Sequence, residues 1–164
     1  MVKIYISLGS NIDREANTRA GVAALRQAFG ELELSSVFES EAVGFEGDAF
    51  FNMVIAADTV QPVEQVAAIL HRIEAEQGRS REGPKFSSRT LDLDLLLYGD
   101  QVVDQPGLQI PRDEILKRAF VLWPLAEIAH DDIHPQVGRS YGELWQDFDK
   151  TRERLMPIRF EFDA

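Results

Sequence analysis

Apolar residues along the chain follow two repeating patterns, which predict a mixture of strands and helices. Alternation of apolar and polar residues, rich in Val and Ile, predicts β-strands, and apolar residues spaced three or four positions apart predict helices. The predicted strands cover residues 2–8, 32–38, 51–57 and 90–98, and the predicted helices cover residues 14–29 and 62–78. Gly30 and Gly78 mark the ends of the two helices, and Pro62 begins the second.

The order of these elements is strand, helix, strand, strand, helix, strand. This is the βαββαβ order of ferredoxin-like folds, so we expect an α+β fold with an antiparallel sheet and helices packed on one face. Further along, residues 119–129 and 141–148 favour helices and residues 158–162 alternate like an edge strand, so these segments are C-terminal additions. Because no repeat or linker interrupts the chain, we expect residues 1–164 to form a single domain.

The composition argues against several classes of protein. The chain has no cysteine, which excludes a disulfide framework, a thiolate zinc site and a thiol nucleophile. With 17 basic and 28 acidic residues among 164, its net charge of −11 opposes nucleic-acid binding, which needs a broad basic surface. The longest apolar run, residues 119–126, is less than half of the ~20 residues of a membrane helix. No secretory signal is visible at the start, so we expect a soluble, cytoplasmic protein.

The segment RTLDLDL at residues 89–95 carries the most informative pattern. Because strand side chains alternate, Asp92 and Asp94 share one face, about 6–7 Å apart, while leucines occupy the other. The leucines at residues 95–97 indicate an interior strand, where two carboxylates that repel each other need a cation. Two aspartates suit Mg²⁺, which takes its other ligands from water and substrate phosphates. The alternative is a solvated edge strand whose carboxylates are neutralised by arginines.

A basic cluster directly precedes this carboxylate pair. Residues 78–89 contain four basic side chains, Arg79, Arg81, Lys85 and Arg89, against the single acid Glu82. Alone, such a cluster is typical of a solvated loop, but guanidinium groups also suit phosphate oxygens. Metal on one side of a polyphosphate and arginines on the other is the usual arrangement for phosphoryl transfer. The loops at residues 39–49 and 78–88 are long for this chain, which makes both candidates for function or mobile connections.

Other motifs that carry chemistry are absent from the sequence or weak. It contains neither of the common glycine-rich phosphate-binding loops and no G-x-S-x-G nucleophile elbow. His130 and His134 flank Asp131 and Asp132, which is a spacing that metal sites use. Since no third ligand accompanies them, we expect surface or capping roles for these histidines.

Aromatic and amide side chains indicate a site for a heterocycle. Phe50 and Phe51 precede Asn52, which offers both a donor and an acceptor to the edge of a ring. Phe120 lies further along the chain, and most phenylalanines of this kind belong to a core. Phe86 is an exception, because it lies in the polar arginine loop without periodic apolar partners.

Together these features resemble the 6-hydroxymethyl-7,8-dihydropterin pyrophosphokinase family of folate biosynthesis. The resemblance covers nearly the whole chain, with GSN at residues 9–11, FN at 51–52, ExxxGR at 74–79, RTLDLD at 89–94 and RAFVLWPL at 118–125. It implies a ferredoxin-like fold, which agrees with the order of predicted elements. The implied reaction moves a diphosphate from ATP to the pterin: the hydroxymethyl oxygen attacks the β-phosphorus and AMP leaves.

The resemblance implies a role for each matching residue. Asp92 and Asp94 would bind two Mg²⁺ ions brought with ATP, while Arg79 and Arg89 would contact the phosphates and neutralise charge during transfer. The implied nucleotide site comprises His71, Glu74, Arg81, Arg112 and Arg118. The implied pterin site comprises Asn52 as a hydrogen-bonding residue, Phe120 as a stacking residue, and Ser40, Val43, Gly44, Phe50 and Phe86 around them.

The sequence departs from the family's usual pattern at several positions. FSS at residues 86–88 stands where Trp-Gly-Pro is common, and Arg112, His71 and Phe50 stand where His, Gln and Tyr are more usual. Since the metal ligands are unchanged, we expect an active, monomeric enzyme with altered loop kinetics or nucleotide affinity. Two alternatives stay open: a catalytically weak paralogue that binds pterin or nucleotide without turnover, and a palm-type nucleotidyl-transfer domain, which the acidity of the chain opposes.

Overall fold

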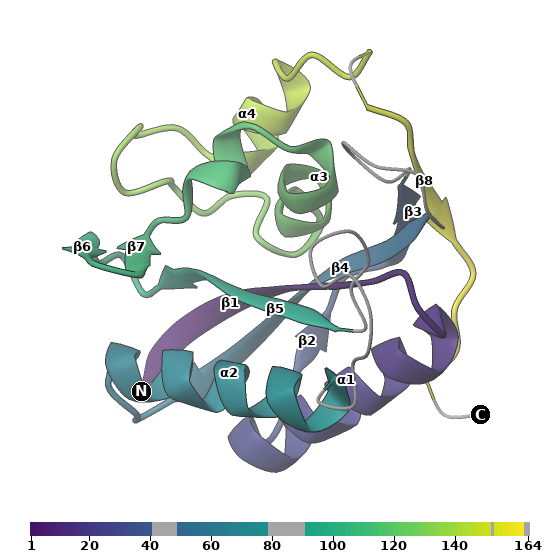
Figure 1. Cartoon of the computed structure of the whole chain (residues 1–164). Coiled ribbons are helices and arrows are strands. Elements are labelled where there is room, and N and C mark those ends of the chain that lie inside the picture. The colour runs from purple at the N-terminus through teal and green to yellow at the C-terminus, as the bar shows by residue number, and fades with distance from the viewer. Residues whose placement is uncertain (41–48, 79–90, 152, 163–164) are drawn as a thin grey trace.

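The computed structural model describes residues 1–40, 49–78, 91–151 and 153–162, and Figure 1 shows their arrangement. The strands are β1 (Val2–Ser10), β2 (Glu33–Leu34), β3 (Val37–Ser40), β4 (Phe50–Thr59), β5 (Asp92–Tyr98), β6 (Val103–Gln105), β7 (Leu108–Ile110) and β8 (Leu155–Ile158). The helices are α1 (Arg14–Phe29), α2 (Val63–Gly78), α3 (Ala119–Ile128) and α4 (Tyr141–Gln146), with a 3-10 helix at Asp113–Leu116.

The main sheet is antiparallel, with the strand order β5–β1–β4–β3–β8 and with the short β2 also paired to β4. β1 and β4 lie side by side at its centre, from Val2 opposite Thr59 to Ser10 opposite Phe51. The chain passes through α1 between β1 and β2, and through α2 between β4 and β5, which pairs with the other side of β1. This arrangement confirms the predicted ferredoxin-like βαββαβ core. β6 and β7 form a separate hairpin.

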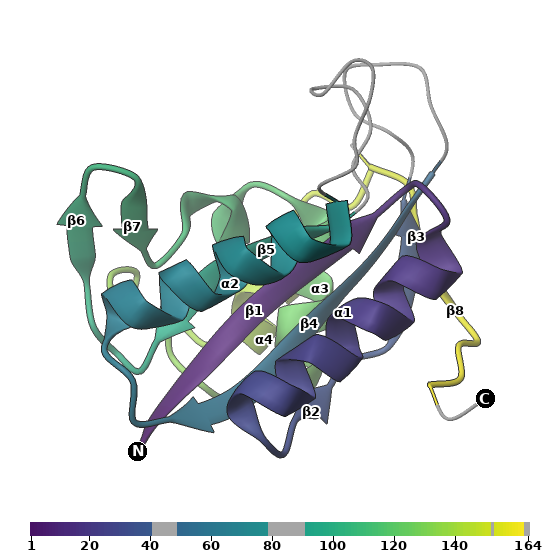
Figure 2. The same ribbon diagram turned by 60° about the horizontal axis from the view of Figure 1, so that its bottom comes forward.

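Helices cover both faces of the main sheet (Figures 1 and 2). α1 and α2 lie on one face, where Leu25, Leu70 and Ile73 join a buried core with residues of β1, β4 and β5. α3 and α4 lie on the opposite face, where Leu125 and Tyr141 join a second core. The predicted packing of helices on one face is confirmed for α1 and α2, and the C-terminal additions form a third layer. None of the described helices is long and apolar enough to cross a membrane.

β5 lies at an edge of the sheet, so the expectation of an interior strand was wrong. Its leucines are nevertheless buried, because the register with β1 shifts along the strand and both Leu96 and Leu97 pack in the α3-side core. The outer edge of β5 is also occupied by hydrogen bonds. The backbone N–H of Leu93 donates to the Glu74 carboxylate at 2.7 Å, and the backbone N–H of Arg112 donates to the Leu96 carbonyl at 3.0 Å.

Three further differences from the predicted elements are local. The strand predicted at residues 32–38 is divided into β2 and β3, because residues 35–37 stand opposite only two residues of β4. The last strand is Leu155–Ile158 rather than residues 158–162. Its pairing with β3 stops where Ile158 stands opposite Val37, the first residue of β3, and the chain then packs against the α1-side core. The β6–β7 hairpin was not predicted, although Gly107 at its turn has a φ of +77° that favours glycine.

Candidate functional site

Asp92 and Asp94 lie on the same face of β5, as their spacing predicts. Both are half-buried, whereas Leu93 and Leu95 between and after them are buried. Asp94 stands opposite Ser7 of β1, which in turn stands opposite Val54 of β4, a member of the α3-side core. Because residues directly opposite each other in a sheet point to the same side, both carboxylates face the α3 side.

A row of three residues crosses the sheet beside this carboxylate pair. Gly9 of β1 stands between Asp92 of β5 and Asn52 of β4. Neighbouring strands lie ~4.8 Å apart, so the Asp92 and Asn52 backbones are about 10 Å apart. A Cβ atom on Gly9 would come within 3.2 Å of Nδ2 of Asn52. The absence of a side chain at Gly9 therefore leaves room for the Asn52 amide on the surface of the sheet between Asn52 and Asp92.

Among the described residues, the positive charge near the Asp94 carboxylate does not offset the effect of its partial burial. A guanidinium nitrogen of Arg112 lies 3.5 Å from Oδ1 of Asp94, whose side chain is 32% exposed. Partial burial, together with the nearby carboxylates of Asp92 and Glu114, raises the pKa of Asp94 to about 6 despite the opposing effects of Arg112 and His71. A further cation at this position would stabilise the ionised form.

These residues fit a hard divalent cation. Two half-buried carboxylates on one face provide oxygen ligands, and the raised pKa of Asp94 fits a position where a bound cation would favour the ionised carboxylate. The described residues contain no group of three or more metal-ligating side chains. Mg²⁺ suits such a set, because it needs few protein ligands and keeps water or phosphate oxygens in its other positions.

Residues predicted to bind the nucleotide are placed on two parts of the molecule. His71 of α2, Asp94 and Arg112 line one surface hollow, together with Gln109 of β7. Arg118 lies elsewhere, immediately before α3, where its guanidinium is 3.7 Å from the carboxylate of Glu153. Glu74 binds the backbone of β5 rather than lining this hollow.

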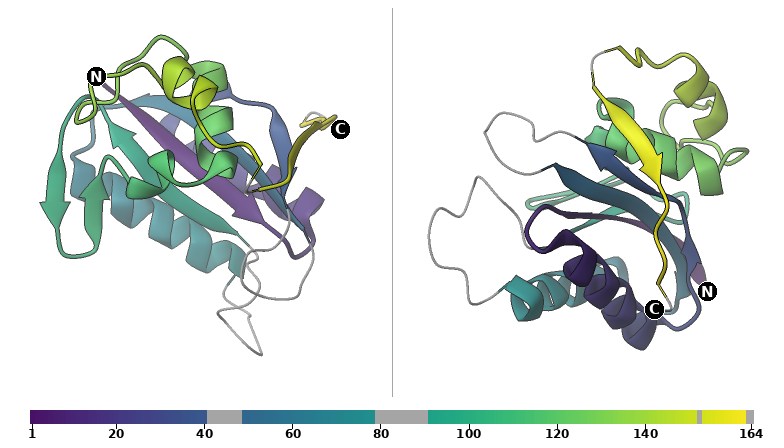
Figure 3. Two further views of the ribbon diagram at one scale, coloured as in Figure 1. Left: turned by 90° about the horizontal axis from the view of Figure 1, so that it is seen from above. Right: turned by 90° about the vertical axis from the view of Figure 1, so that its right-hand side faces the viewer.

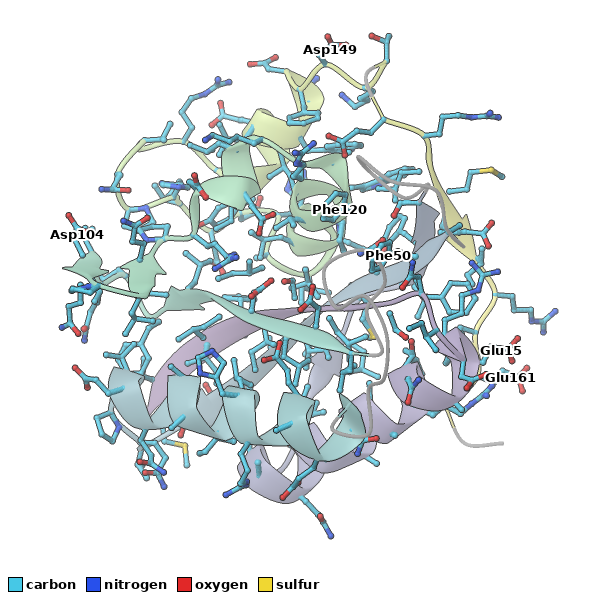
Figure 4. The ribbon with its side chains drawn as sticks, in the orientation of Figure 1. Glu15, Phe50, Asp104, Phe120, Asp149 and Glu161 are labelled. Atoms are coloured by element: carbon cyan, nitrogen blue, oxygen red, sulfur yellow. The ribbon has the colours of Figure 1, made fainter. Side chains whose placement is uncertain are left out.

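Four residues predicted for the pterin site are described, and they lie on the α3 side of the sheet or in α3. The Ser40 hydroxyl donates to Oδ1 of Asn52 at 2.6 Å, and both side chains are buried. This contact, together with the position of Nδ2 near Gly9, orients the Asn52 amide. Phe50 of β4 and Phe120 in the first turn of α3 are both half-buried, and Figure 4 shows their positions. An amide and two aromatic rings are suitable groups for binding a flat heterocycle.

The remaining predicted site residues lie outside the described part of the chain. These residues are Val43, Gly44, Arg79, Arg81, Phe86 and Arg89. Their proposed roles rest on the sequence alone, as does the role of the basic loop.

Sequence reasoning did not identify Gly9 or Glu153 as site residues. Gly9 was visible within the GSN segment, but its place between Asn52 and Asp92 depends on the register of three strands. Glu153 had no local signal, because its contacts with Arg118 and Ala119 join segments more than thirty residues apart in the chain.

The two histidines have different surroundings. His130 is exposed, as expected, and its Nδ1 lies 2.9 Å from the Asp131 carboxylate. His134 is buried rather than on the surface, and its Nδ1 accepts hydrogen bonds from the backbone N–H groups of Gln136 and Val137. Its capping role is therefore confirmed in a buried position.

Comparisons with known proteins agree with the fold. The model of the family described as 7,8-dihydro-6-hydroxymethylpterin-pyrophosphokinase matches residues 5–130. A Pseudomonas aeruginosa protein is 39% identical over 150 residues, which cover 87% of this chain and 89% of the relative. A Bacillus subtilis protein is 41% identical over 128 residues, which cover 76% of each chain. Both relatives are named 2-amino-4-hydroxy-6-hydroxymethyldihydropteridine pyrophosphokinase.

Solved structures share the fold at low sequence identity. The crystal structure of a Plasmodium falciparum HPPK-DHPS triple mutant with pteroate superposes with a TM-score of 0.70 at 11% identity. The match covers 88% of this chain but only 43% of that larger chain. The family match and the two bacterial relatives span most of the sequence, and the chain belongs to the 7,8-dihydro-6-hydroxymethylpterin-pyrophosphokinase family.

Proposed function

We propose that the protein transfers the diphosphate of ATP to 6-hydroxymethyl-7,8-dihydropterin, a step of folate biosynthesis, and releases AMP. Family membership and the names of the bacterial relatives support this activity. The observation that carries it is the row Asn52–Gly9–Asp92. It places an amide suited to the pterin and a carboxylate suited to a metal–phosphate complex on one face of the sheet.

Asp92 and Asp94 would hold Mg²⁺ together with the phosphates of ATP. The bound ion would supply charge neutralisation and would help to align the phosphates. Half-burial of the two carboxylates supports this role, because electrostatic attraction is stronger away from bulk water. His71 and Arg112 lie at the same hollow as Asp94, which suits contacts with the nucleotide.

The pterin would lie on the α3 side of the sheet, between Asn52 and Phe120. Ser40 holds Oδ1 of Asn52, which leaves the amide hydrogens available to acceptors on the ring. Phe50 and Phe120 would contact its flat faces. In this position the pterin hydroxymethyl group would lie toward Gly9 and Asp92, where the phosphates are expected.

Transfer would proceed by attack of the hydroxymethyl oxygen on the β-phosphorus. The new O–P bond forms as the bond from the β-phosphorus to the oxygen of the α-phosphate breaks, AMP leaves with that oxygen, and the hydroxyl proton passes to solvent. Positioning and charge neutralisation supply most of the catalysis in reactions of this type. Arg79, Arg89 and Arg118 would bind phosphate oxygens as the charge shifts toward AMP.

The test is to incubate the protein with ATP, Mg²⁺ and 6-hydroxymethyl-7,8-dihydropterin and to identify the products by mass spectrometry. We expect AMP and pterin diphosphate in equal amounts, with neither formed when the pterin or Mg²⁺ is omitted. ADP with a pterin monophosphate would contradict diphosphate transfer. Tight binding of both substrates without any product would instead identify the protein as a pterin- and nucleotide-binding module.

We also propose that the whole chain acts as one domain and as a monomer. The main support is that both faces of the sheet are covered by helices of the same chain. Light scattering during size-exclusion chromatography measures the molar mass directly. A mass of two or more chains at micromolar concentration would contradict the monomer.

A further inference from the structure

Residues 153–162, here called the C-terminal arm, lie beyond the part of the chain that the family model matches. The arm leaves the layer of α3 and α4, passes along the sheet as β8 and then contacts α1 (Figure 3, right). Its contacts reach both walls of the proposed pterin site. One wall is the first turn of α3, and the other is formed by β3 and β4.

At one end of the arm, Glu153 caps α3. Its Oε1 accepts a hydrogen bond of 3.0 Å from the backbone N–H of Ala119, and its Oε2 lies 3.7 Å from the guanidinium of Arg118. The Glu153 side chain is only 14% exposed, so water competes little for these contacts. A carboxylate in this position stabilises the first turn of a helix through its unpaired N–H groups and its dipole. The next residue in that turn is Phe120.

Two residues after Glu153, the arm pairs with β3. Leu155 stands opposite Ser40, and the pairing continues to Ile158 opposite Val37. β3 is paired to β4 on its other side, so β8 turns β3 from an edge strand into an interior strand. Ser40 is the residue whose hydroxyl holds Asn52. Pairing with β8 therefore restrains the backbone that carries this hydroxyl.

Beyond β8, the arm packs against the face of β4 that is turned toward α1. The Phe160 ring meets the Phe51 ring edge to face, with centroids 5.7 Å apart. The guanidinium of Arg19 lies 4.7 Å from the centre of the Phe160 ring, and its Nε donates to the Glu161 carbonyl at 2.9 Å. Phe51 immediately precedes Asn52, so the arm supports β4 beside the proposed pterin-binding amide.

We propose that the C-terminal arm is a positioning element of the pterin site, with Glu153 as its principal residue. Glu153 holds the first turn of α3, and with it Phe120, in a set position relative to Ser40 and Asn52. The two walls belong to different layers of the molecule, and the arm contacts both of them. This inference rests on the proposed function, because pterin is the ligand that these walls would enclose.

The test compares Glu153→Ala with Glu161→Ala, a matched loss of one carboxylate from the same arm. Pterin affinity is measured by fluorescence titration with saturating Mg²⁺ and α,β-methylene-ATP, which cannot transfer its diphosphate. We expect Glu153→Ala to weaken pterin binding about fivefold, because the bound pterin must then order the first turn of α3 against the usual loss of helix stability that accompanies removal of a cap. Glu161→Ala is expected to stay within twofold of wild type, because Glu161 is exposed and it is the Glu161 backbone that binds Arg19.

A conservative variant and steady-state kinetics separate positioning from a general loss of structure. Glu153→Gln keeps an oxygen that can accept from Ala119, so it is expected to bind pterin more tightly than Glu153→Ala does. For Glu153→Ala, the KM for pterin rises, because Phe120 orients the substrate. Any change in kcat is expected to be smaller than the change in KM, because Arg118, which loses its contact with Glu153, is one of three arginines proposed to bind the phosphates. All titrations are made well below the melting temperature of each variant.

Three outcomes would overturn the inference. The first is equal pterin affinity for the two alanine variants, and the second is an equal loss for Glu153→Ala and Glu153→Gln. The third is a fall in kcat with no change in KM. If the wild-type protein neither binds pterin nor forms AMP, the proposed function itself fails. If wild type is active and the variants behave alike, only the role of the arm fails.

Discussion

The guanidinium of Arg112 lies 3.5 Å from Oδ1 of Asp94, and its Nε also donates to Oε1 of Glu114 at 2.8 Å. One cation of the chain therefore already lies beside Asp94. Mg²⁺ bound by Asp94 would approach this guanidinium, and two positive charges so close together repel each other. We therefore expect Arg112 to have two opposite effects, favouring contacts with nucleotide phosphates and disfavouring binding of the metal alone.

Arg112→Gln is expected to bind a divalent cation about fivefold more tightly in the absence of nucleotide. The change removes a positive charge near Asp94, which is worth about 1 kcal/mol in a half-exposed site. Mn²⁺ is a suitable probe, and electron paramagnetic resonance measures its free concentration. Lys117→Gln is the matched control, because this exposed lysine pairs with Asp113. An equal effect of both variants would assign the change to net charge alone.

Asp94→Asn is expected to lower kcat at least about 100-fold, because it removes an oxygen ligand of the charge-neutralising ion. Its folded state is not expected to be less stable at pH 7. Since burial raises the pKa of Asp94 to about 6, the ionised carboxylate is unfavourable in the folded protein above that pH. Thermal unfolding and AMP formation are measured together, with Asp104→Asn as an exposed control. Turnover within tenfold of wild type would refute the assignment of Asp94 to the metal.

Ser40→Ala is expected to raise the KM for pterin about fivefold and to lower the free energy of unfolding by about 1 kcal/mol. The Ser40 hydroxyl is buried and donates to Oδ1 of Asn52, so its loss leaves the amide without this partner. Steady-state kinetics and urea unfolding measure the two effects. Ser36→Ala removes an exposed hydroxyl from the adjoining segment and is expected to leave the KM unchanged. A wild-type KM in Ser40→Ala would show that the amide is oriented without Ser40.

His134→Asn is expected to make stability less dependent on pH in mildly acidic solution. Burial lowers the pKa of His134, whose Nδ1 accepts two backbone hydrogen bonds that protonation would break. Below about pH 6.5 the unfolded chain takes up a proton that the folded protein does not. The free energy of unfolding therefore decreases as the pH is lowered, until His134 also becomes protonated in the folded protein. Urea unfolding between pH 5 and pH 8 (roughly the range in which histidines titrate) measures this slope. His130→Asn changes an exposed histidine and should retain the wild-type slope.

Features that depend on neighbouring residues in the chain were predictable. The bounds of α1 match the apolar spacing of residues 14–29, and the face shared by Asp92 and Asp94 follows from the two-residue period of a strand. The same reasoning misplaced β5, since a run of leucines shows that a strand is buried but does not show how. Here helices cover both faces of an edge strand, and Glu74 binds its outer edge.

The sequence by itself determined the helices, most of the strands, the carboxylate pair and the family resemblance, because each depends on local periodicity or on short motifs. Only the tertiary structure decided that Gly9 separates Asn52 from Asp92, that Arg112 approaches Asp94 and that Glu153 caps α3. Strand register and contacts between layers join residues that are distant in the chain. Many pairings are compatible with the same local patterns, and packing of the whole core selects one of them.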